Sequence, residues 1–358
     1  MKKVLLIALA AAALAACTKT EANYTASQEI AFKPVAKYDT KAAVTGATYG
    51  ADLPFYVFAN AKTDGANYFV SKYFEKVLFV PETDATTTGL QVYHGETAQY
   101  WPNVNPLVFA GLTKSGNIEG MKVNDYNEDS RIETSDELSK IEIYGYEQPW
   151  SVEAPAANDF MYFFADNNNV GYTNDTGYVT PVMKHACSWI TVNIKAENEL
   201  VTYWKNLKVT DIHFEALHLC GNATLRCDRE VSEANHAVNW NVSGEATAGV
   251  KIFVESKKPA VEFSNEVTAE FKMFESVANN TIVIPQAPAQ LSVTYTYTTP
   301  AGLDNFTETK ILPLNYDGDK AWQPGKHYTY NMTLTAEEIK IAPSSEDWGT
   351  SVSTGKEI

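Results

Sequence analysis

Cys17 is the residue of this chain whose surroundings point most directly to a chemical role. It follows two alanines at the end of an apolar run over residues 4–13, which begins just after two lysines. A cationic start, a short apolar segment and small residues are typical of a secretory signal, and the run is too short to span a bilayer about 30 Å thick. We therefore predict a removed lipoprotein signal over residues 1–16 and lipid attachment at Cys17, the alternative being an ordinary signal with a chance cysteine. Thr18 follows this cysteine, whereas an aspartate at that position would favour retention in the inner membrane. Thr18 therefore indicates export to the outer membrane.

Three further cysteines could form a disulfide or bind a metal. Cys220 and Cys227 flank a short segment that begins Gly-Asn. That segment could connect a hairpin, so these two cysteines could form a disulfide in an oxidising compartment. The alternative is that they and Cys187 all remain unpaired. Paired Cys-x-x-Cys or His-x-x-x-His spacing is missing, so we predict no metal and no cofactor.

Two acidic motifs resemble known signatures but lack required partners. Residues 175–177 match the Asp-Thr-Gly tripeptide of aspartic proteases, yet that chemistry needs a second carboxylate and the motif occurs once. Residues 125–136 resemble a calcium loop, but Ser130 stands where the loop needs glycine and Asp136 where it needs glutamate. We interpret the first as a turn and the second as a solvated acidic loop.

The remaining features argue against an enzyme and against a nucleic-acid partner. The six histidines share no metal or triad spacing, and no nucleophile-elbow, phosphate-loop or dinucleotide motif occurs. Scattered carboxylates could still pair in space as in a glycosidase, but no spacing predicts it. With 28 basic against 44 acidic residues, the net charge of −16 repels nucleic acid.

Alternating apolar and polar residues recur along the chain and predict strands. Period two combined with β-branched and aromatic residues is typical of half-buried strands, and Asp, Asn and Gly clusters separate the segments. The alternating segments cover residues 55–58, 140–144, 189–194, 207–214, 267–274, 291–297 and 328–334. About 340 mature residues exceed one comfortable core, so we predict a mostly β fold of two sandwiches.

Helical character is confined to two segments, and one polar stretch suggests a domain boundary. Residues 67–77 could form a short amphipathic helix, and residues 135–139 a helical turn. Polar turn residues dominate between 167 and 184. We place an N-terminal β-sandwich domain at 24–184 and a C-terminal one at 185–358.

Several short motifs occur in an order that resembles one family. They are Glu29-Ile30-Ala31-Phe32, Thr40-Lys41-Ala42, Leu53-Pro54-Phe55-Tyr56-Val57-Phe58-Ala59, Tyr100-Trp101-Pro102, Leu107-Val108-Phe109-Ala110-Gly111, Asn158-Asp159-Phe160-Met161-Tyr162, Val283-Ile284-Pro285-Gln286, Trp322-Gln323-Pro324-Gly325-Lys326-His327-Tyr328-Thr329-Tyr330 and Glu346-Asp347-Trp348. In this order, behind a lipid-attachment signal, they resemble the fimbrillin (Mfa-like) family of type V pilus subunits over nearly all the mature chain.

The resemblance implies two tandem transthyretin-like β-sandwiches and a route to polymers. The lipidated precursor reaches the cell surface, and a protease then cuts after a basic residue behind the first strand. Loss of that strand opens an apolar groove, which the terminal strand of a neighbouring subunit fills. Main-chain hydrogen bonds give such strand addition its affinity, and alternate side chains fill pockets.

Mapped onto this sequence, the first strand covers residues 28–36 and has Ile30 and Phe32 on one face. The cut sites implied are Lys37 and Lys41. The alternative is that both lysines are surface residues that are never cleaved, and the arginine that often precedes the family's cuts is missing here.

The donor segment implied by the resemblance covers residues 338–358. Within it, Ile339 and Ile341 alternate before Trp348. The alternative is a plain closing strand of the second domain. We expect Trp322 to pack in the interior rather than to contact a ligand.

These implications lead to a structural surface protein rather than an enzyme. The chain would be a stalk, tip or anchor subunit that polymerises with like or unlike pilus subunits, contributes to adhesion, and attaches to the outer membrane through its lipid. The alternative is a monomeric lipid-anchored surface protein that binds a glycan or a host protein. An exposed aromatic platform beside carboxylates would favour that alternative.

Overall fold

The computed structural model describes 28–36, 53–61, 71–82, 91–102, 107–150, 159–166, 178–197, 200, 203–227, 236–254, 261–262, 271–272, 281–299, 304–315, 321–335 and 337–347. The predicted signal, Cys17, Lys37, Lys41 and Trp348 lie outside the described residues. Within the described part, no helix is long and apolar enough to cross a membrane.

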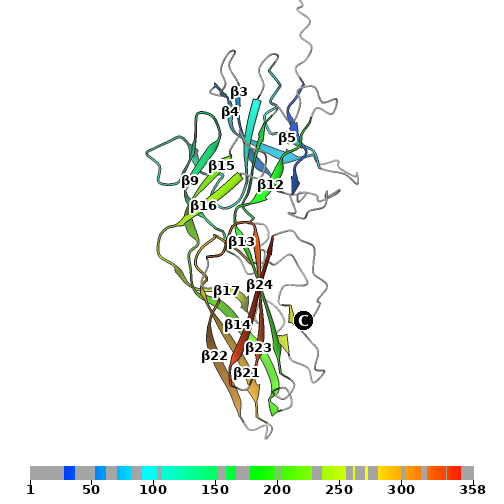
Figure 1. Cartoon of the computed structure of the whole chain (residues 1–358), viewed down its shortest axis with the longest axis vertical. Coiled ribbons are helices and arrows are strands. Elements are labelled where there is room, and N and C mark those ends of the chain that lie inside the picture. The colour runs from blue at the N-terminus through cyan, green and yellow to red at the C-terminus, as the bar shows by residue number, and fades with distance from the viewer. Residues whose placement is uncertain are drawn as a thin grey trace, which may run out of the picture.

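Strands make up almost all of the regular secondary structure in the described residues, which confirms the mostly β prediction (Figure 1). In chain order they are β1 (Ala31–Phe32), β2 (Val35–Ala36), β3 (Phe55–Ala61), β4 (Ser71–Pro81), β5 (Tyr93–Gly95), β6 (Leu107–Thr113), β7 (Lys122–Val123), β8 (Arg131–Thr134), β9 (Lys140–Glu147), β10 (Met161–Asp166), β11 (Tyr178–Val179), β12 (Val182–His185), β13 (Ser188–Ala196), β14 (Lys205–Leu217), β15 (Cys220–Cys227), β16 (His236–Val242), β17 (Thr247–Val254), β18 (Val261–Glu262), β19 (Phe271–Lys272), β20 (Thr281–Val283), β21 (Gln290–Thr298), β22 (Asn305–Pro313), β23 (Lys326–Leu334) and β24 (Ile339–Asp347).

The upper part of the molecule in Figure 1 is built on a nine-stranded sheet in the order β11-β1-β5-β4-β3-β6-β10-β12-β2. Both faces of this sheet are covered, because every residue of β3 and β6 is buried. Phe55 and Val57 enter one core, together with Phe32. Tyr56 and Phe58 enter a second core on the opposite face, which the sheet β16-β15-β9-β8-β7 helps to form.

The lower part is a sandwich of two sheets, which we call the lower sandwich. One sheet has the order β19-β13-β23-β24 and the other β17-β14-β21-β22. Alternate residues of β13 and β23 face a single core shared with β14 and β21. Trp322 lies in this core with no exposed surface, and its Nε1 donates a hydrogen bond to the Tyr330 hydroxyl at 2.8 Å. The expectation that Trp322 packs in the interior is therefore confirmed.

The predicted helix over residues 67–77 is wrong for the part that the structure describes. Residues 71–77 belong to β4, and Lys76 has a positive φ of 51° where the pairing with β3 shifts register. Between the pairs Ala59–Phe74 and Val57–Val77, β4 holds one residue more than β3, which is a β-bulge. The bulge turns Phe74 and Val77 toward the same core, so apolar residues acquire the three-residue spacing of a helix. Residues 135–139 form a turn joining β8 to β9.

The predicted boundary at 184/185 does not separate the sheets. Strands β15 and β16 lie after that boundary, yet β15 pairs with β9 in the upper part, with Ala223 opposite Ile143. The chain therefore returns from the lower sandwich to complete the upper core before it re-enters the lower sandwich at β17 (Figure 1).

Candidate functional site

The N-terminal segment 29–36 lies between two other segments of the upper sheet and pairs with both. On one side, β1 pairs antiparallel with β5. On the other side, β1 and β2 pair parallel with β11 and β12, in one continuous register. The amide of Lys33 donates to the carbonyl of Val179 at 2.7 Å, and that of Val35 to Pro181 at 2.9 Å. We call the space between β5 and β11–β12 the N-terminal slot.

The side chains of this segment are part of the core. Ile30 and Phe32 have no exposed surface, and Ala31 has 3%. The two larger side chains enter the same cluster, which confirms the predicted face. The ring of Phe32 lies 4.8 Å from that of Phe79 and 5.4 Å from that of Phe109, both edge-on, a favourable aromatic geometry.

The same segment joins the two ends of the upper sheet. Strand β1 lies beside β11 at one end of the strand order, and β2 pairs with β12 at the other end. Without residues 29–36, the backbone groups of β5, β11 and β12 that face the slot would lose their hydrogen-bond partners. The aromatic core would also lose the side chains of Ile30 and Phe32. An unpaired strand edge beside an apolar pocket is a template for another strand.

Strand β24 is the edge strand of the lower sandwich. It pairs with β23 over nine residues, from Ile339 opposite Leu334 to Asp347 opposite Lys326, and those last two side chains form an ion pair. Ile339 is buried and Ile341 half-buried against the core, whereas residues 342–345 are exposed. Few side chains therefore hold this strand in place.

Of the two states that the sequence left open for Cys220 and Cys227, the structure excludes the disulfide. The two residues are the first and last of one continuous strand, β15. Eight strand residues at about 3.3 Å each separate their Cα atoms by roughly 23 Å, whereas a disulfide needs about 4.4–6.8 Å. Cys187 is a buried thiol, and burial raises its pKa well above the ordinary value.

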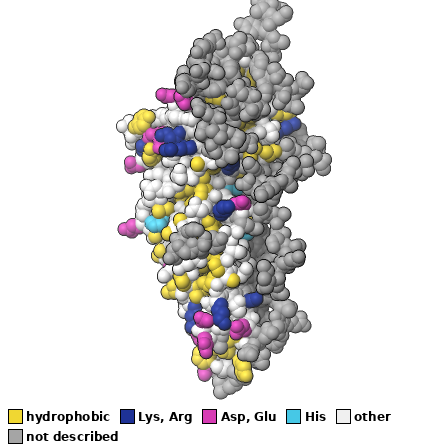
Figure 2. Space-filling model, in the orientation of Figure 1, with side chains coloured by type: hydrophobic (Ala, Val, Ile, Leu, Met, Phe, Trp, Pro, Cys, Tyr) yellow, Lys and Arg dark blue, Asp and Glu magenta, His cyan; other side chains and the backbone are white. Residues whose placement is uncertain are grey.

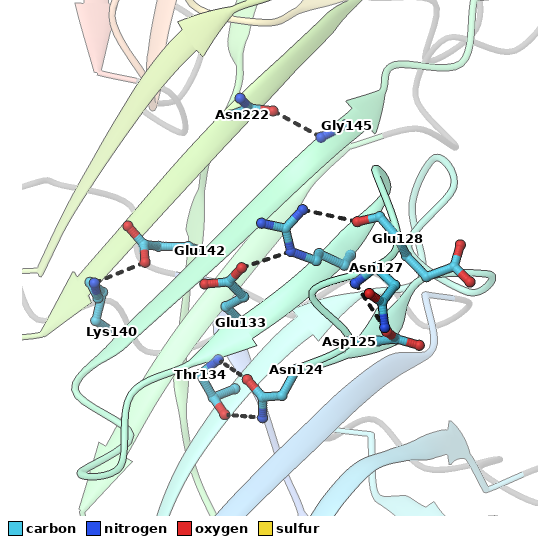
Figure 3. Close-up of polar contacts among 11 residues, drawn as sticks. Asn124, Asp125, Asn127, Glu128, Glu133, Thr134, Lys140, Glu142, Gly145 and Asn222 are labelled. Atoms are coloured by element: carbon cyan, nitrogen blue, oxygen red, sulfur yellow. Dashed lines mark hydrogen bonds and ion pairs between the residues drawn. The ribbon is translucent and has the colours of Figure 1, made fainter.

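The acidic loop that resembled a calcium site uses its carboxylates for local contacts. Asp125 Oδ1 accepts a hydrogen bond from the backbone amide of Asn127 at 3.2 Å (Figure 3). Lys122 Nζ lies 2.6 Å from a carboxylate oxygen of Glu128 and 3.6 Å from one of Asp125. Across the described residues, His, Cys, Asp and Glu form no group of three that could hold a metal ion. The loop is therefore a turn in which Lys122 is the counter-ion of Asp125 and Glu128.

An aromatic stack lies where β14 begins and the β21–β22 hairpin ends, at the lower end of the molecule in Figure 1. The rings of Trp204 and Tyr297 stack 3.8 Å apart, and that of Phe306 follows 5.4 Å from Tyr297. Phe306 is 39% exposed and Tyr203 is 65% exposed. On the face drawn in Figure 2, hydrophobic side chains at this end lie beside acidic and basic ones.

A carboxylate belongs to this stack. Glu308 accepts hydrogen bonds from the hydroxyls of Tyr297 at 2.7 Å and Tyr295 at 2.8 Å. The bond from Tyr297 comes first among the causes that lower the pKa of Glu308. Sequence reasoning placed Tyr295 and Tyr297 on one strand but missed the cluster. The alternation Phe306-x-Glu308 on the next strand, β22, was the available signal, because it puts both side chains on one face.

Comparisons with known proteins place the chain among fimbrial proteins. A family described as fimbrillin-like matches residues 40–348. A crystal structure of a fimbrial protein from Bacteroides vulgatus ATCC 8482 has a TM-score of 0.57 to this chain at 15% identity, covers 89% of this chain and 99% of its own length, and therefore shows a shared fold. A candidate cell adhesion protein from Bacteroides uniformis ATCC 8492 has a TM-score of 0.47 at 14% identity, with 90% and 99% covered. The tip fimbrial protein Mfa3 from Porphyromonas gingivalis, truncated at its C-terminus, has a TM-score of 0.34 at 11% identity, with 89% and 99% covered. No curated protein matches the chain.

Proposed function

The chain belongs to the fimbrillin-like family, and from this premise we propose that it is a structural subunit of a cell-surface fimbria that polymerises by strand exchange. The precursor is lipidated at Cys17 and carried to the outer membrane. A protease then cuts after Lys37 or Lys41 and releases the first strand. The terminal strand of a neighbouring subunit, of the same or another kind, fills the N-terminal slot. As in the sequence-based prediction, the chain is a structural protein and not an enzyme.

The observation that carries this proposal is the double pairing of residues 29–36. A strand held only on one edge could leave without opening the core. Here removal exposes pairing groups on both neighbours and the pocket of Phe32 together. An incoming strand therefore regains main-chain hydrogen bonds on two sides and buries apolar side chains at the same time, which supports strand exchange as the route to a stable polymer.

The way β24 is held supports its role at the start of a donor segment. Releasing this strand from β23 exposes one buried side chain, Ile339, and one half-buried one, Ile341. At about 25 cal/mol per Å² of apolar surface, that loss amounts to a few kcal/mol. Insertion into the N-terminal slot would bury these isoleucines again and restore main-chain hydrogen bonds, which would offset that loss. Residues 348–358, including Trp348, complete the proposed segment.

The decisive experiment is intact-mass analysis and N-terminal sequencing of the protein sheared from cells. Material that begins at Tyr38 or Ala42 and runs as an SDS-resistant ladder is the expected result. Protein carrying alanine at both Lys37 and Lys41 should remain monomeric. Monomers of the unaltered protein that still begin at acylated Cys17 would exclude a stalk role and leave an anchor or a ligand-binding protein.

The aromatic stack of the lower sandwich favours a second candidate function, the binding of a glycan. Sugar rings present apolar faces that pack on exposed aromatic rings, and their hydroxyls bond to carboxylates. Phe306 offers an open ring near the Glu308 carboxylate. A glycan array should then lose signal with Phe306→Ala and keep it with Ile311→Ala, which alters an exposed residue on the other face of β22. Equal signals from both variants would exclude this site.

A further inference from the structure

The strand pair β15–β16 brings a thiol and an imidazole into contact at the rim of the upper core. Cys227 and His236 stand directly opposite each other in the antiparallel register. The Cys227 Sγ lies 3.1 Å from His236 Nε2, within hydrogen-bonding distance. Both side chains are half-buried, so solvent reaches them. The sequence alone does not indicate this contact, because the two residues are nine positions apart and belong to no recognised motif.

The surroundings of the pair hold it in place. Cys227 packs against the upper core, and its backbone amide donates to the carbonyl of Ser139 at 2.8 Å. The imidazole of His236 meets the ring of Phe164 edge-on, with centroids 5.6 Å apart. An imidazole fixed beside a sulfur can take up the thiol proton without a search through rotamers.

The ionisable groups around the pair do not prevent a thiolate from forming next to an imidazolium. On β10, the Tyr162 hydroxyl is kept neutral, because burial first, and then the Cys227 sulfur, raise its pKa. On the opposite face of the sheet, Arg226 of β15 stands opposite Lys140 of β9, whose ammonium is paired with the Glu142 carboxylate at 2.9 Å. A neutral phenol, an arginine and a lysine that is already paired with a carboxylate do not oppose ionisation of the thiol.

We infer that Cys227 and His236 form a nucleophilic thiol–imidazole pair whose target is a small disulfide. The Nε2 atom of His236 takes the proton of the thiol, and the Cys227 thiolate attacks one sulfur of the disulfide R–S–S–R. The S–S bond of the reagent breaks as the Cys227–S–S–R bond forms, and the thiolate RS⁻ leaves. The product is a mixed disulfide at the rim of the upper core.

Cys220 provides a matched comparison on the same strand. It is also half-buried, but burial and then the carboxylate of Glu147 raise its pKa, so less of it is thiolate. Cys187 is completely buried. An unassisted thiol is only a few per cent ionised at pH 7, so we expect Cys227 to react about tenfold faster than Cys220 at that pH, after allowance for the lower nucleophilicity of a more acidic thiol.

The test uses the whole folded chain and dithiobis(nitrobenzoate) as the disulfide. The rate is followed by the released thiolate, and mass spectrometry of peptides locates the mixed disulfide. The fast reaction should disappear with Cys227→Ser, persist with Cys220→Ser, and slow about tenfold at pH 7 with His236→Gln, whose rate should recover at higher pH. In denaturant, all cysteines with free thiols should react alike.

A fast reaction that survives Cys227→Ser, or one that His236→Gln leaves unchanged in a folded protein, would overturn the inference. If His236→Gln does not fold, the pH dependence of the two cysteine rates in the unaltered protein tests the pair. Its Cys227 rate should level off at a lower pH than its Cys220 rate, and coincident pH profiles would refute the pair. This inference does not depend on the proposed fimbrial function.

Discussion

Truncating Phe32 tests whether side-chain packing holds the first strand in its slot. The ring has no exposed surface and lies 4.8–5.8 Å from the rings of Phe79, Phe109, Phe55 and Phe163. Burial of this kind makes Phe→Ala cost about 3–5 kcal/mol, from lost transfer energy and the cavity left behind. Edge-on contacts add about 0.5–1.5 kcal/mol each. We therefore expect Phe32→Ala to destabilise the upper part by about 4 kcal/mol.

Two assays measure this effect. Urea titration should show the loss in the free energy of unfolding, and hydrogen exchange should show faster exchange at the amides of Lys33 and Val35, which bond to the neighbouring segment. At 1.4 kcal/mol per tenfold, exchange should accelerate by up to about a thousandfold. The control is Phe306→Ala, at a 39% exposed position, which should cost less than about 1 kcal/mol. If Phe32→Ala cost no more than the control and left exchange unchanged, the packing argument would be refuted.

Three further predictions concern other parts of the chain. Ile339→Ala should lower the free energy of unfolding of the lower sandwich by about 2 kcal/mol and Ile341→Ala by less than about 1 kcal/mol in urea, because only the first residue is fully buried. Gly111→Ala should cost about 1–3 kcal/mol in thermal melts, because a Cβ there would overlap a phenylalanine ring on β10; a neutral result would contradict this. Burial, then the bond to Glu308, raises the pKa of Tyr297 from 10.0 to about 12. Its contribution to stability is therefore complete below pH 10 and lost between pH 10 and 12, and Tyr297→Phe should flatten that part of a melting-temperature curve.

Local patterning predicted the central strands because their side chains alternate between core and surface. Ile190, Val192 and Ile194 are all buried, and the residues between them are only half-buried. The first strand was predictable in the same way, since Ile30 and Phe32 enter one cluster. The strands that pair with it were not predictable from the sequence. Strands β5 and β11 are only two or three residues long, too short for a period to be visible.

Long-range pairing explains the remaining errors. Nothing local to Cys220 or Cys227 indicates that the segment between them lies along β9, about 80 positions earlier in the chain. Gly221 suggested a turn, but it serves a close approach, since a Cβ there would lie 3.2 Å from the carbonyl oxygen of Asn241 on the adjacent strand. The bulge at Lys76 likewise depends on the pairing of β4 with β3. It gives the apolar residues of β4 the three-residue spacing that the sequence analysis interpreted as a helix.

The directions of the strands that border the N-terminal slot affect how another strand can enter it. Strand β1 runs antiparallel to β5 and parallel to β11, so β5 and β11 run in opposite directions. A filler strand of either orientation would therefore make one parallel and one antiparallel ladder. Backbone hydrogen bonding is thus nearly indifferent to the direction of insertion. The orientation of any strand that replaces residues 29–36, and with it the polarity of a fibre, is encoded by the shape of the pocket around Phe32.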